Sequence, residues 1–528
     1  MDLKIILIII FASFLYFFKI NVIPNGVYSD EATVGYNAYS ILQTGKDEYG
    51  QKFPLAFRFF GAYTPPLFVY ISIPFIKLLG LKVGSLRIIS GLSTILGIYL
   101  IYFYSEKLNL FNSKASRYLA SFTFAITPWV VFNARLGYEV TLGYIIFSLG
   151  LFLIWDKLIK NKISISGLII LSLSTYIGHT QRYLFPVFLL FFSLIFYSKL
   201  KTKNNLKLLP KNLFLLFITQ IPNIILLTTP AFWVKNNVYV NTNIYQLFND
   251  FSSQLLTYFS PKYIFGISPD INLQHTSPYL PLFYSWLIIP FFVGLYQLYL
   301  TRKTLNGKYL WLIFLISPVP GSLSGHFISV QRVLSMIIPI VLIITLGFDL
   351  LITKIRRLYI IFVLSFLTIM SLLFLWRSYF IFLPKERSVW WNYGFKELSQ
   401  EIKNNPTKKY IIDNTRDASI YMNLLFHLQY SPSLLQKNFL NYEKIYYTNP
   451  HFNPNYNFAN IEIRPIYWEK DIYIDQILVG DSLAISDSQA KSHFLKKVID
   501  IKDPTGKSLI VGYETNPLAK YNSKNSKL

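Results

Sequence analysis

Long apolar runs, separated by short polar segments, recur from residue 3 to about residue 380. A helix of about 20 apolar residues crosses the hydrocarbon core of a bilayer. The pattern therefore predicts a polytopic α-helical membrane protein with about 11 transmembrane helices. The predicted spans are residues 3–20, 86–104, 118–134, 139–155, 163–178, 183–198, 212–229, 280–300, 309–320, 333–350 and 358–380.

Basic residues are concentrated in one set of the loops between these spans. They gather at residues 105–117, 156–162, 199–211, 301–308 and 352–357. Lysine- and arginine-rich loops face the cytoplasm. We therefore expect a cytoplasmic N-terminus, and outer loops on the opposite side. The first span lacks a small-x-small cleavage site after it, so it is expected to be a retained anchor in the cell membrane.

The segment Pro65–Gly80 is apolar and tests this arrangement. If it crossed the membrane completely, every later basic loop would lie outside. The segment is short and contains Pro74 and Lys77. It is therefore expected to lie in the interface or to re-enter the membrane.

The composition changes at about residue 381, where amphipathic stretches begin to alternate with short β-rich segments such as 409–413, 476–480 and 508–512. Residues 381–528 are expected to form an α/β domain, which an odd number of spans places outside the membrane. Residues 1–380 would then form the catalytic membrane domain, with residues 21–85 as its first extracytoplasmic loop.

Composition and charge agree with this organisation. The chain has 528 residues, of which 53% are hydrophobic and only 14% charged, against about 25% charged in soluble domains. The net charge of +24 lies mostly in loops between spans, so it indicates topology rather than nucleic-acid binding. The chain has no cysteine, which excludes disulfides, thiolate metal sites and cysteine nucleophiles.

The most informative polar feature is Asp30-Glu31, directly after the first span. Carboxylates near hydrocarbon are costly and mark functional sites. Ser29 is expected to cap a helix that runs to Thr44 and stops at Gly45. The structural alternative is that two acids in a first turn simply complement the helix dipole.

Three isolated arginines, Arg135, Arg182 and Arg332, lie at the outer ends of predicted spans. A guanidinium group binds phosphate through forked hydrogen bonds. A lipid-linked phosphate is the phosphorylated ligand that such a membrane pocket would meet. The alternative is that each arginine only reaches toward lipid headgroups.

Other polar residues on the outer side are candidates to line the site or to bind an acceptor. His179 and His326 match no metal-ligand spacing and are better explained as hydrogen-bonded structural histidines. The sequence therefore supports no cofactor, and it leaves a divalent metal open. The full candidate set is Asp47, Glu48, Tyr63, Glu139, His179 and His326.

A carboxylate together with arginines indicates sugar transfer from a polyprenyl phosphate. The carboxylate can take the proton of an acceptor hydroxyl or amine. The arginines can stabilise the departing lipid phosphate. Direct displacement needs no enzyme nucleophile and inverts the anomeric configuration.

The same residues resemble the GT-C glycosyltransferases, in particular the protein O-mannosyltransferase and aminoarabinose-transferase-like group. The resemblance rests on the first loop from Tyr28 to Pro65-Pro66-Leu67, on Thr127–Arg135, and on Gly325–Pro339. It implies a polyprenyl-phosphate sugar donor, inverting transfer on the outer face, Asp30 beside Glu31 as the base or acceptor-binding group, and Arg135 facing the donor phosphate. Thr64 stands where the family often has lysine, and Val333 stands where it often has tyrosine.

Two other functions compete with a glycosyltransferase. A flippase of lipid-linked saccharides also needs basic pocket residues, but it favours mid-span charges and repeat symmetry. A catalytically dead assembly subunit would not need Asp30. The sugar and the acceptor, whether protein, lipid or polysaccharide, stay open.

Overall fold

The structure is a computed structural model that describes residues 2–239, 243–267, 273–325, 328–354, 357–439, 445, 448–449 and 455–525. The chain forms two compact units. The helical unit comprises Met1–Ile20, Tyr63–Ile71 and Leu86–Ile381. The mixed unit comprises Asn21–Ala62, Ser72–Ser85 and Phe382–Leu528.

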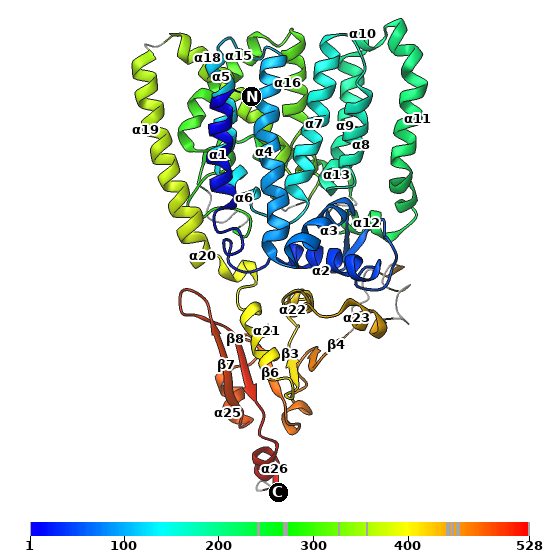
Figure 1. Ribbon diagram of the computed structural model, residues 1–528, viewed down its shortest axis with the longest axis vertical. Coiled ribbons are helices and arrows are strands. Elements are labelled where there is room, and N and C mark those ends of the chain that lie inside the picture. Colours follow the sequence, from blue (N-terminus) through cyan, green and yellow to red (C-terminus); the bar gives the residue numbers. More distant parts are fainter. Residues whose placement is uncertain are drawn as a thin grey trace. The chain divides into compact units, whose positions relative to one another are not determined.

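Each of the predicted spans coincides with a helix (Figure 1). The apolar runs fix the position of these helices, and polar residues with caps such as Ser113 and Ser164 fix their starts. The helices are α1 (Leu3–Phe17), α4 (Val83–Lys107), α5 (Lys114–Ile126) with α6 (Pro128–Asn133), α7 (Val140–Ile159), α8 (Ile165–Ser174), α9 (His179–Ile195), α11 (Lys203–Leu226), α15 (Ile288–Leu300), α16 (Leu305–Ile316), α18 (Ile337–Lys354) and α19 (Arg357–Leu375).

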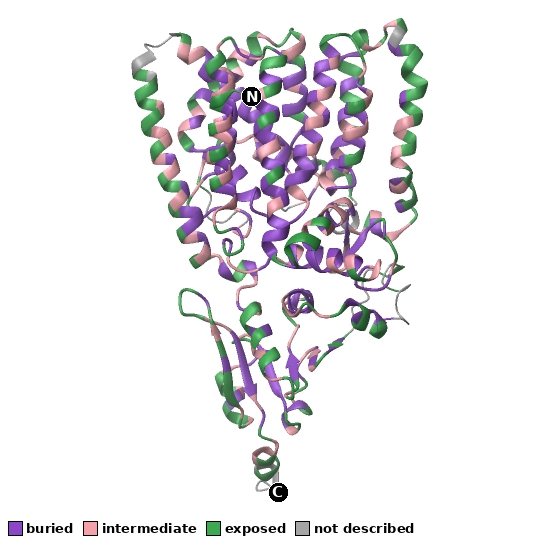
Figure 2. Cartoon of the chain, in the orientation of Figure 1, coloured by how far each residue is buried: buried purple, intermediate pink, exposed green. Residues whose placement is uncertain are grey.

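Within the described residues, five helical stretches are long and apolar enough to cross a membrane: Val83–Lys107, Val140–Ile159, Asn205–Leu226, Leu334–Thr353 and Ile361–Glu386. These helices make the chain a multi-pass membrane protein, while the number of crossings stays a prediction. In the apolar 18-residue segment of each stretch, 72% is buried inside the protein in Leu334–Thr353 but only 11% in Asn205–Leu226. Leu334–Thr353 is therefore a core helix, whereas Asn205–Leu226 presents apolar side chains that lipid can cover (Figure 2).

Close backbone contact holds α15 against α18. A Cβ atom at Gly294 would collide with the carbonyl oxygen of Ile343, and one at Gly347 would collide with the carbonyl oxygen of Pro290. Only glycine permits this reciprocal approach, which is the usual way in which small residues pack helices in a membrane. α18 also packs against α5.

The described residues between 230 and 280, which lie between two predicted spans, contain three helices. They are α12 (Pro230–Tyr239), α13 (Ile244–Phe259) and α14 (Pro261–Phe265). α13 packs against the short helix α17 (Val319–Ser322). Its apolar residues are too few to read as a span, so hydropathy alone did not find it. α10 (Tyr197–Leu200) is a further short helix.

The segment expected to re-enter the membrane forms α3 (Leu67–Leu79), after two short strands, β1 (Phe57–Phe59) and β2 (Ala62–Thr64). The helix has 13 residues and contains Pro74. At 1.5 Å per residue it is about 20 Å long, which is shorter than the hydrocarbon core of about 30 Å. Its length agrees with the prediction, and its place in the membrane stays a prediction.

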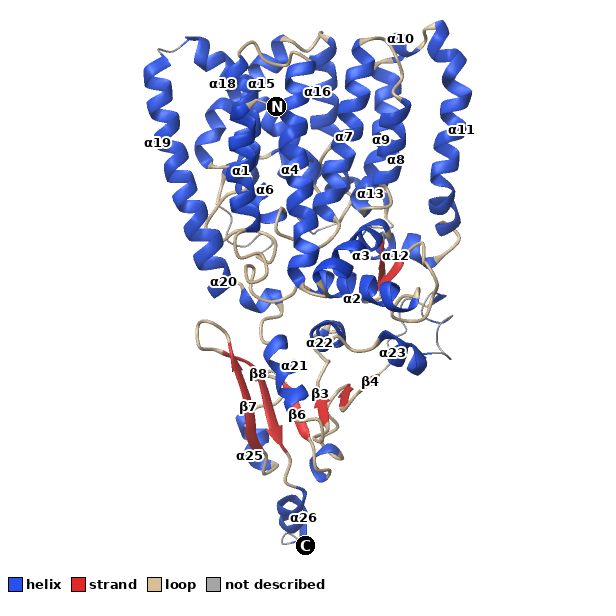
Figure 3. Cartoon of the chain, viewed as in Figure 1, coloured by secondary structure: helices blue, strands red, loops and turns tan. Residues whose placement is uncertain are grey.

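The C-terminal part of the mixed unit is an α/β domain, as its alternating pattern predicted (Figure 3). Its sheet has the order β4-β5-β3-β6-β8-β7, in which β3 pairs in parallel with β5 and β6. Buried residues such as Ile411, Leu478 and Val511 form its core. The strands are β3 (Tyr410–Ile412), β4 (Tyr456–Phe458), β5 (Ile461–Ile463), β6 (Ile477–Gly480), β7 (Lys496–Lys502) and β8 (Ser508–Glu514).

Short helices precede, connect and follow these strands: α20 (Leu383–Glu386), α21 (Phe395–Asn404), α22 (Ile420–Leu428), α23 (Pro432–Phe439), α25 (Asp487–Ser492) and α26 (Pro517–Asn525). α2 (Ser29–Thr44), from the first loop, packs against α22 and α23. The sequence assigned this loop to the membrane part, whereas most of its residues share a compact unit with residues 382–528.

Candidate functional site

α2 carries the Asp-Glu pair in its first turn. The helix begins at Ser29, with Tyr28 as its N-cap residue, one position before the predicted cap. It ends at Thr44, and Gly45 follows with φ +71°, the left-handed conformation that glycine adopts without strain. The predicted stop at Gly45 is therefore confirmed.

The two carboxylates of the pair have different surroundings. The side chain of Glu31 is buried, and its Oε2 accepts a hydrogen bond of 3.1 Å from the backbone N–H of Tyr28. This contact satisfies a donor at the open start of the helix. Asp30 remains partly exposed. Glu31 thus stabilises the turn, and Asp30 is the more exposed member of the pair.

Residues 391 and 392, from the start of the C-terminal domain, hold the segment before Asp30. The side-chain amide of Asn392 donates hydrogen bonds to the carbonyl of Val27 (3.0 Å) and to the hydroxyl of Ser29 (3.2 Å). The ring of Trp391 lies 5.5 Å from that of Tyr28, between centroids. The entry to α2 is therefore positioned by the distant part of the chain.

Gln436 on α23 holds the other end of α2. Its Nε2 donates to the hydroxyl of Ser40 (3.1 Å), the hydroxyl of Thr44 (3.0 Å) and the carbonyl of Asp47 (2.7 Å). A buried amide that bonds three acceptors fixes both the helix end and the turn that follows it.

Asp47 and Glu48 follow α2 in a tight turn and are each only 1% exposed. Asp47 Oδ1 accepts the N–H groups of Tyr49 (3.0 Å) and Gln51 (2.9 Å). The side chain of Asp47 therefore stabilises a polar turn.

The carboxyl group of Glu48 is buried among polar side chains. Its Oε1 accepts a 3.2 Å hydrogen bond from the side chain of Asn37. Burial and the neighbouring charge of Asp47 raise the pKa of Glu48 well above its ordinary value, against the opposing effects of Asn37 and Arg58. Surroundings of this kind favour the protonated form of a carboxyl group.

Three buried tyrosines lie beside Glu48. The hydroxyl of Tyr49 is 3.2 Å from that of Tyr421 and 3.1 Å from that of Tyr456. The rings of Tyr421 and Tyr456 stack with centroids 3.8 Å apart. Burial, with the charge of Glu48, raises the pKa of Tyr456 to about 12. The cluster joins the first loop to α22 and β4 and is a buried, hydrogen-bonded core.

Arg135 in the helical unit is fully buried. Its guanidinium carbon lies 5.3 Å from the ring centre of Tyr379 and 5.1 Å from that of Phe380. It donates hydrogen bonds of 2.7 to 2.8 Å to three carbonyl oxygens at the C-terminal end of α1, those of Leu15, Tyr16 and Phe18. These carbonyls have no partner within their own helix, so Arg135 caps α1.

Arg182 and Arg332 share a neighbour. Both guanidinium charges act on the hydroxyl of Tyr183, and Arg332 also acts on that of Tyr258. Arg182 Nε donates a 3.1 Å hydrogen bond to the carbonyl of Thr175. Arg182 and Tyr183 lie at the start of α9.

The remaining candidates in the helical unit are dispersed. The ring Nε2 of His179 lies 2.8 Å from the carbonyl of Tyr63, which is the structural hydrogen bond expected for this histidine. Glu139 is partly exposed directly before α7. His326 lies outside the described residues. Across the part of the chain that the structure describes, no group of three or more His, Asp or Glu side chains could hold a metal ion.

Sequence reasoning missed Asn392, Gln436, Tyr183 and Tyr258. No spacing connects Asn392 or Gln436 with α2, because more than 300 positions separate them from the residues that they bind. Tyr183 directly follows Arg182, so a search around each arginine would have found it. Tyr258 lies on the helix that hydropathy overlooked.

By sequence, the chain matches no protein-family model and none of the curated proteins. By structure, it matches ArnT from Cupriavidus metallidurans. The crystal structure bound to undecaprenyl phosphate gives a TM-score of 0.57 at 11% identity, over 96% of this chain and 97% of that one. The apo structure gives 0.56 over the same shares.

This chain has the fold of ArnT. The match extends over the apolar helices and the C-terminal domain together, and it confirms the GT-C-like fold that the first-loop motif indicated. Archaeal oligosaccharyltransferase AglB from Archaeoglobus fulgidus, in complex with an inhibitory peptide and a dolichol-phosphate, aligns at 12% identity over 98% of this chain and 74% of that one, with a TM-score of 0.48.

Proposed function

We propose that this chain is a membrane glycosyltransferase that transfers a sugar from a polyprenyl-phosphate donor to an acceptor, with inversion at the anomeric carbon. The observation that carries the proposal is the similarity to the ArnT fold along nearly the whole chain. The matching ArnT structure has undecaprenyl phosphate bound. The partly exposed Asp30 on the first outer helix supplies the chemical group that such a reaction needs.

In this reaction the bond between the anomeric carbon and the phosphate oxygen breaks, and a bond from the same carbon to the acceptor oxygen or nitrogen forms. The acceptor proton passes to the carboxylate of Asp30, which acts as general base. The lipid phosphate leaves with the bonding electron pair. The base catalysis is expected to contribute about 10²- to 10⁴-fold to the rate.

Arg182 and Arg332 are assigned to the lipid phosphate. Both charges act electrostatically on Tyr183, and guanidinium groups beside a leaving phosphate stabilise the charge that develops on it. The guanidinium of Arg135 already bonds three backbone carbonyls. In this proposal it therefore supports the end of α1, and its predicted contact with the donor is left to experiment.

The proposal places the active face outside the cell membrane, with a cytoplasmic N-terminus and the C-terminal domain on the outer side. It rests on the basic loops between spans. Residues 21–85 and 381–528 would then share the outer compartment, and the compact unit that joins most of the first loop to the C-terminal domain supports this arrangement.

The test is transfer of radiolabel from a polyprenyl-phosphate sugar by the purified chain in reconstituted membranes. Release of lipid phosphate coupled to a new glycoside supports the proposal. Movement of intact labelled lipid across the membrane, without release, would instead indicate a flippase.

A further inference from the structure

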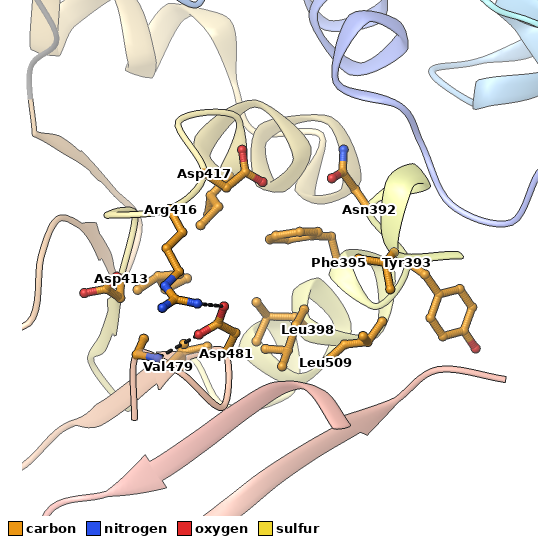
Figure 4. A pocket seen from close by; sticks show the side chains of 16 residues that line it. Asn392, Tyr393, Phe395, Leu398, Asp413, Arg416, Asp417, Val479, Asp481 and Leu509 are labelled. Carbon is orange, nitrogen blue, oxygen red and sulfur yellow. Dashed lines mark hydrogen bonds and ion pairs between the residues drawn. The ribbon is translucent and has the colours of Figure 1, made fainter. Parts of the chain in front are cut away.

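A cavity of about 180 Å³ lies within the C-terminal domain, at the carboxyl ends of β3 and β6 (Figure 4). Asp413 follows β3 directly, and Asp481 follows β6. The backbone N–H of Asp413 donates to the carbonyl of Val479. This hydrogen bond holds the ends of β3 and β6 together beside the cavity. All of its lining residues belong to the mixed unit.

The topology of the sheet makes this edge a natural binding position. β3 has parallel neighbours on both sides, β5 and β6. The chain leaves β3 through α22 and α23 toward β4 and β5, but it leaves β6 toward β7 and β8 on the other side. Connections that diverge in this way leave a crevice beyond the carboxyl ends of the strands, where α/β sheets bind ligands.

The cavity has a polar side and an apolar side. Asp413, Arg416 and Asp481 lie on the polar side. On the other side lie the half-buried side chains of Phe395 and Leu509, with Leu398 between them. Apolar walls with a few converging polar groups are typical of small-molecule sites.

The charges select the kind of ligand. Asp413, Asp417 and Asp481 line the cavity with a single cation, Arg416. Arg416 pairs with Asp481 at 3.2 Å, but both side chains are more than 40% exposed, so the pair is weak. Excess carboxylates repel a phosphate and accept hydrogen bonds from hydroxyl or amino groups. The ligand is therefore neutral or cationic and rich in donors.

The carboxylates are fixed before any ligand arrives. Asp413 Oδ2 accepts the N–H of Ile466 (3.1 Å), and Asp481 Oδ1 accepts the N–H groups of Leu483 (2.9 Å) and Ala484 (2.7 Å). Acceptors held in this way lose little entropy on binding. The cavity is smaller than the roughly 300 to 1,000 Å³ of pockets that enclose a whole ligand, so it accommodates one ring of a larger molecule.

One residue that lines the cavity also contacts the segment directly before Asp30. Asn392 lines it and donates hydrogen bonds to Val27 and Ser29, directly before Asp30. A molecule bound in the cavity is thus connected to the start of α2 through one side chain.

We propose that this cavity binds one sugar ring of the acceptor, neutral or amino-substituted, with its hydroxyl groups on the aspartates and its C–H face on Phe395. This inference rests on the proposed glycosyltransferase function and specifies the acceptor as a carbohydrate. A peptide acceptor would be expected to use a sheet edge or a helical groove, whereas this cavity offers the ends of strands.

The test uses full-length protein in detergent micelles and saturation-transfer NMR with mannose, glucosamine and N-acetylglucosamine, alongside acetyl-lysine-amide and inorganic phosphate as competitors. At least one sugar is expected to receive saturation through its ring C–H protons. Asp481→Asn keeps the Oδ1 acceptor of the turn and is expected to weaken binding at least about tenfold. Leu509→Trp fills the cavity and is expected to abolish binding.

Asp475→Asn is the matched control, because Asp475 precedes the same strand at its other end and is 73% exposed. Binding that is lost in Asp481→Asn and Leu509→Trp but kept in Asp475→Asn supports the site. Binding that is equal in all three, or binding of the lysine or phosphate probe alone, overturns it. Undecaprenyl phosphate affinity, measured on the same variants, is expected to be unchanged. A chain that binds sugar here but never transfers label would refute the proposed function and leave the site standing.

Discussion

The side-chain amide of Asn392 donates a hydrogen bond to the hydroxyl of Ser29, the residue directly before Asp30, across 363 positions of the chain. A second bond from the same amide, to the carbonyl of Val27, fixes the backbone at the entry to α2. The C-terminal domain is thereby coupled to the orientation of the proposed base.

Asn392→Ala is expected to slow sugar transfer about five- to tenfold while leaving donor affinity nearly unchanged. The two lost hydrogen bonds are each worth about 0.5 to 1.5 kcal/mol, so the turn loosens without unfolding. Hydrogen exchange in residues 27–34 should rise in parallel. Asn405→Ala is the control, because the side-chain amide of Asn405 donates to Glu401, four positions before it, and to no residue of α2. Equal transfer rates in the two variants would argue against a positioning role.

Glu48→Gln is expected to make the protein less sensitive to alkaline pH. Because the pKa of Glu48 is raised in the fold, its stabilising contribution is complete below the ordinary value near 4.5 and is lost as pH rises toward the folded pKa. Over that window each pH unit costs the wild type up to about 1.4 kcal/mol. The apparent melting temperatures of wild type and Glu48→Gln should agree near pH 5. By pH 8 the melting temperature of the variant should be the higher of the two. Parallel profiles would show that Glu48 is ionised in the fold.

Arg135→Ala is expected to lower the apparent melting temperature sharply, because three carbonyls at the end of α1 lose their donor. A buried acceptor left without a partner costs about 1 to 3 kcal/mol. Arg182→Ala and Arg332→Ala should instead weaken undecaprenyl phosphate binding with a smaller effect on melting. The reverse pattern, in which only Arg135→Ala affects the lipid, would assign the phosphate to Arg135.

Epitope tags inserted after Asn205 and after Lys385 test the membrane arrangement. The segment around Asn205, at the start of α11, is rich in lysine and is expected to be cytoplasmic, whereas Lys385 is expected outside. Accessibility to a membrane-impermeant label in intact cells measures both. An accessible tag at Asn205 would mean that α3 crosses the membrane completely.

The pattern of apolar runs predicted much of the fold. An apolar run of bilayer length must hydrogen-bond its own backbone groups, and an α-helix is the main structure that does so. It could not find α13, whose apolar stripe covers only part of its surface. The β-rich segments at 409–413, 476–480 and 508–512 were predicted as strands and form β3, β6 and β8. Their order in the sheet depends on long-range pairing that local pattern does not encode.

The candidate site was predicted in part. Asp30 lies in the first turn of α2, as capping chemistry indicated. The sequence could not distinguish it from Glu31, since burial separates the two and neighbours in sequence can face different surroundings. The contacts made by Asn392 and Gln436 join residues that lie hundreds of positions apart. The spacing of residues along the sequence does not reveal such contacts.

The most direct test compares wild type, Asp30→Asn and Glu31→Gln in transfer of label from a polyprenyl-phosphate sugar, with all three matched for donor binding. Asp30→Asn removes the base but keeps the size of the side chain, so a loss of about 100-fold or more is predicted. Glu31→Gln keeps an acceptor for the N–H of Tyr28 and should retain most activity. Full activity in Asp30→Asn would contradict the proposed mechanism.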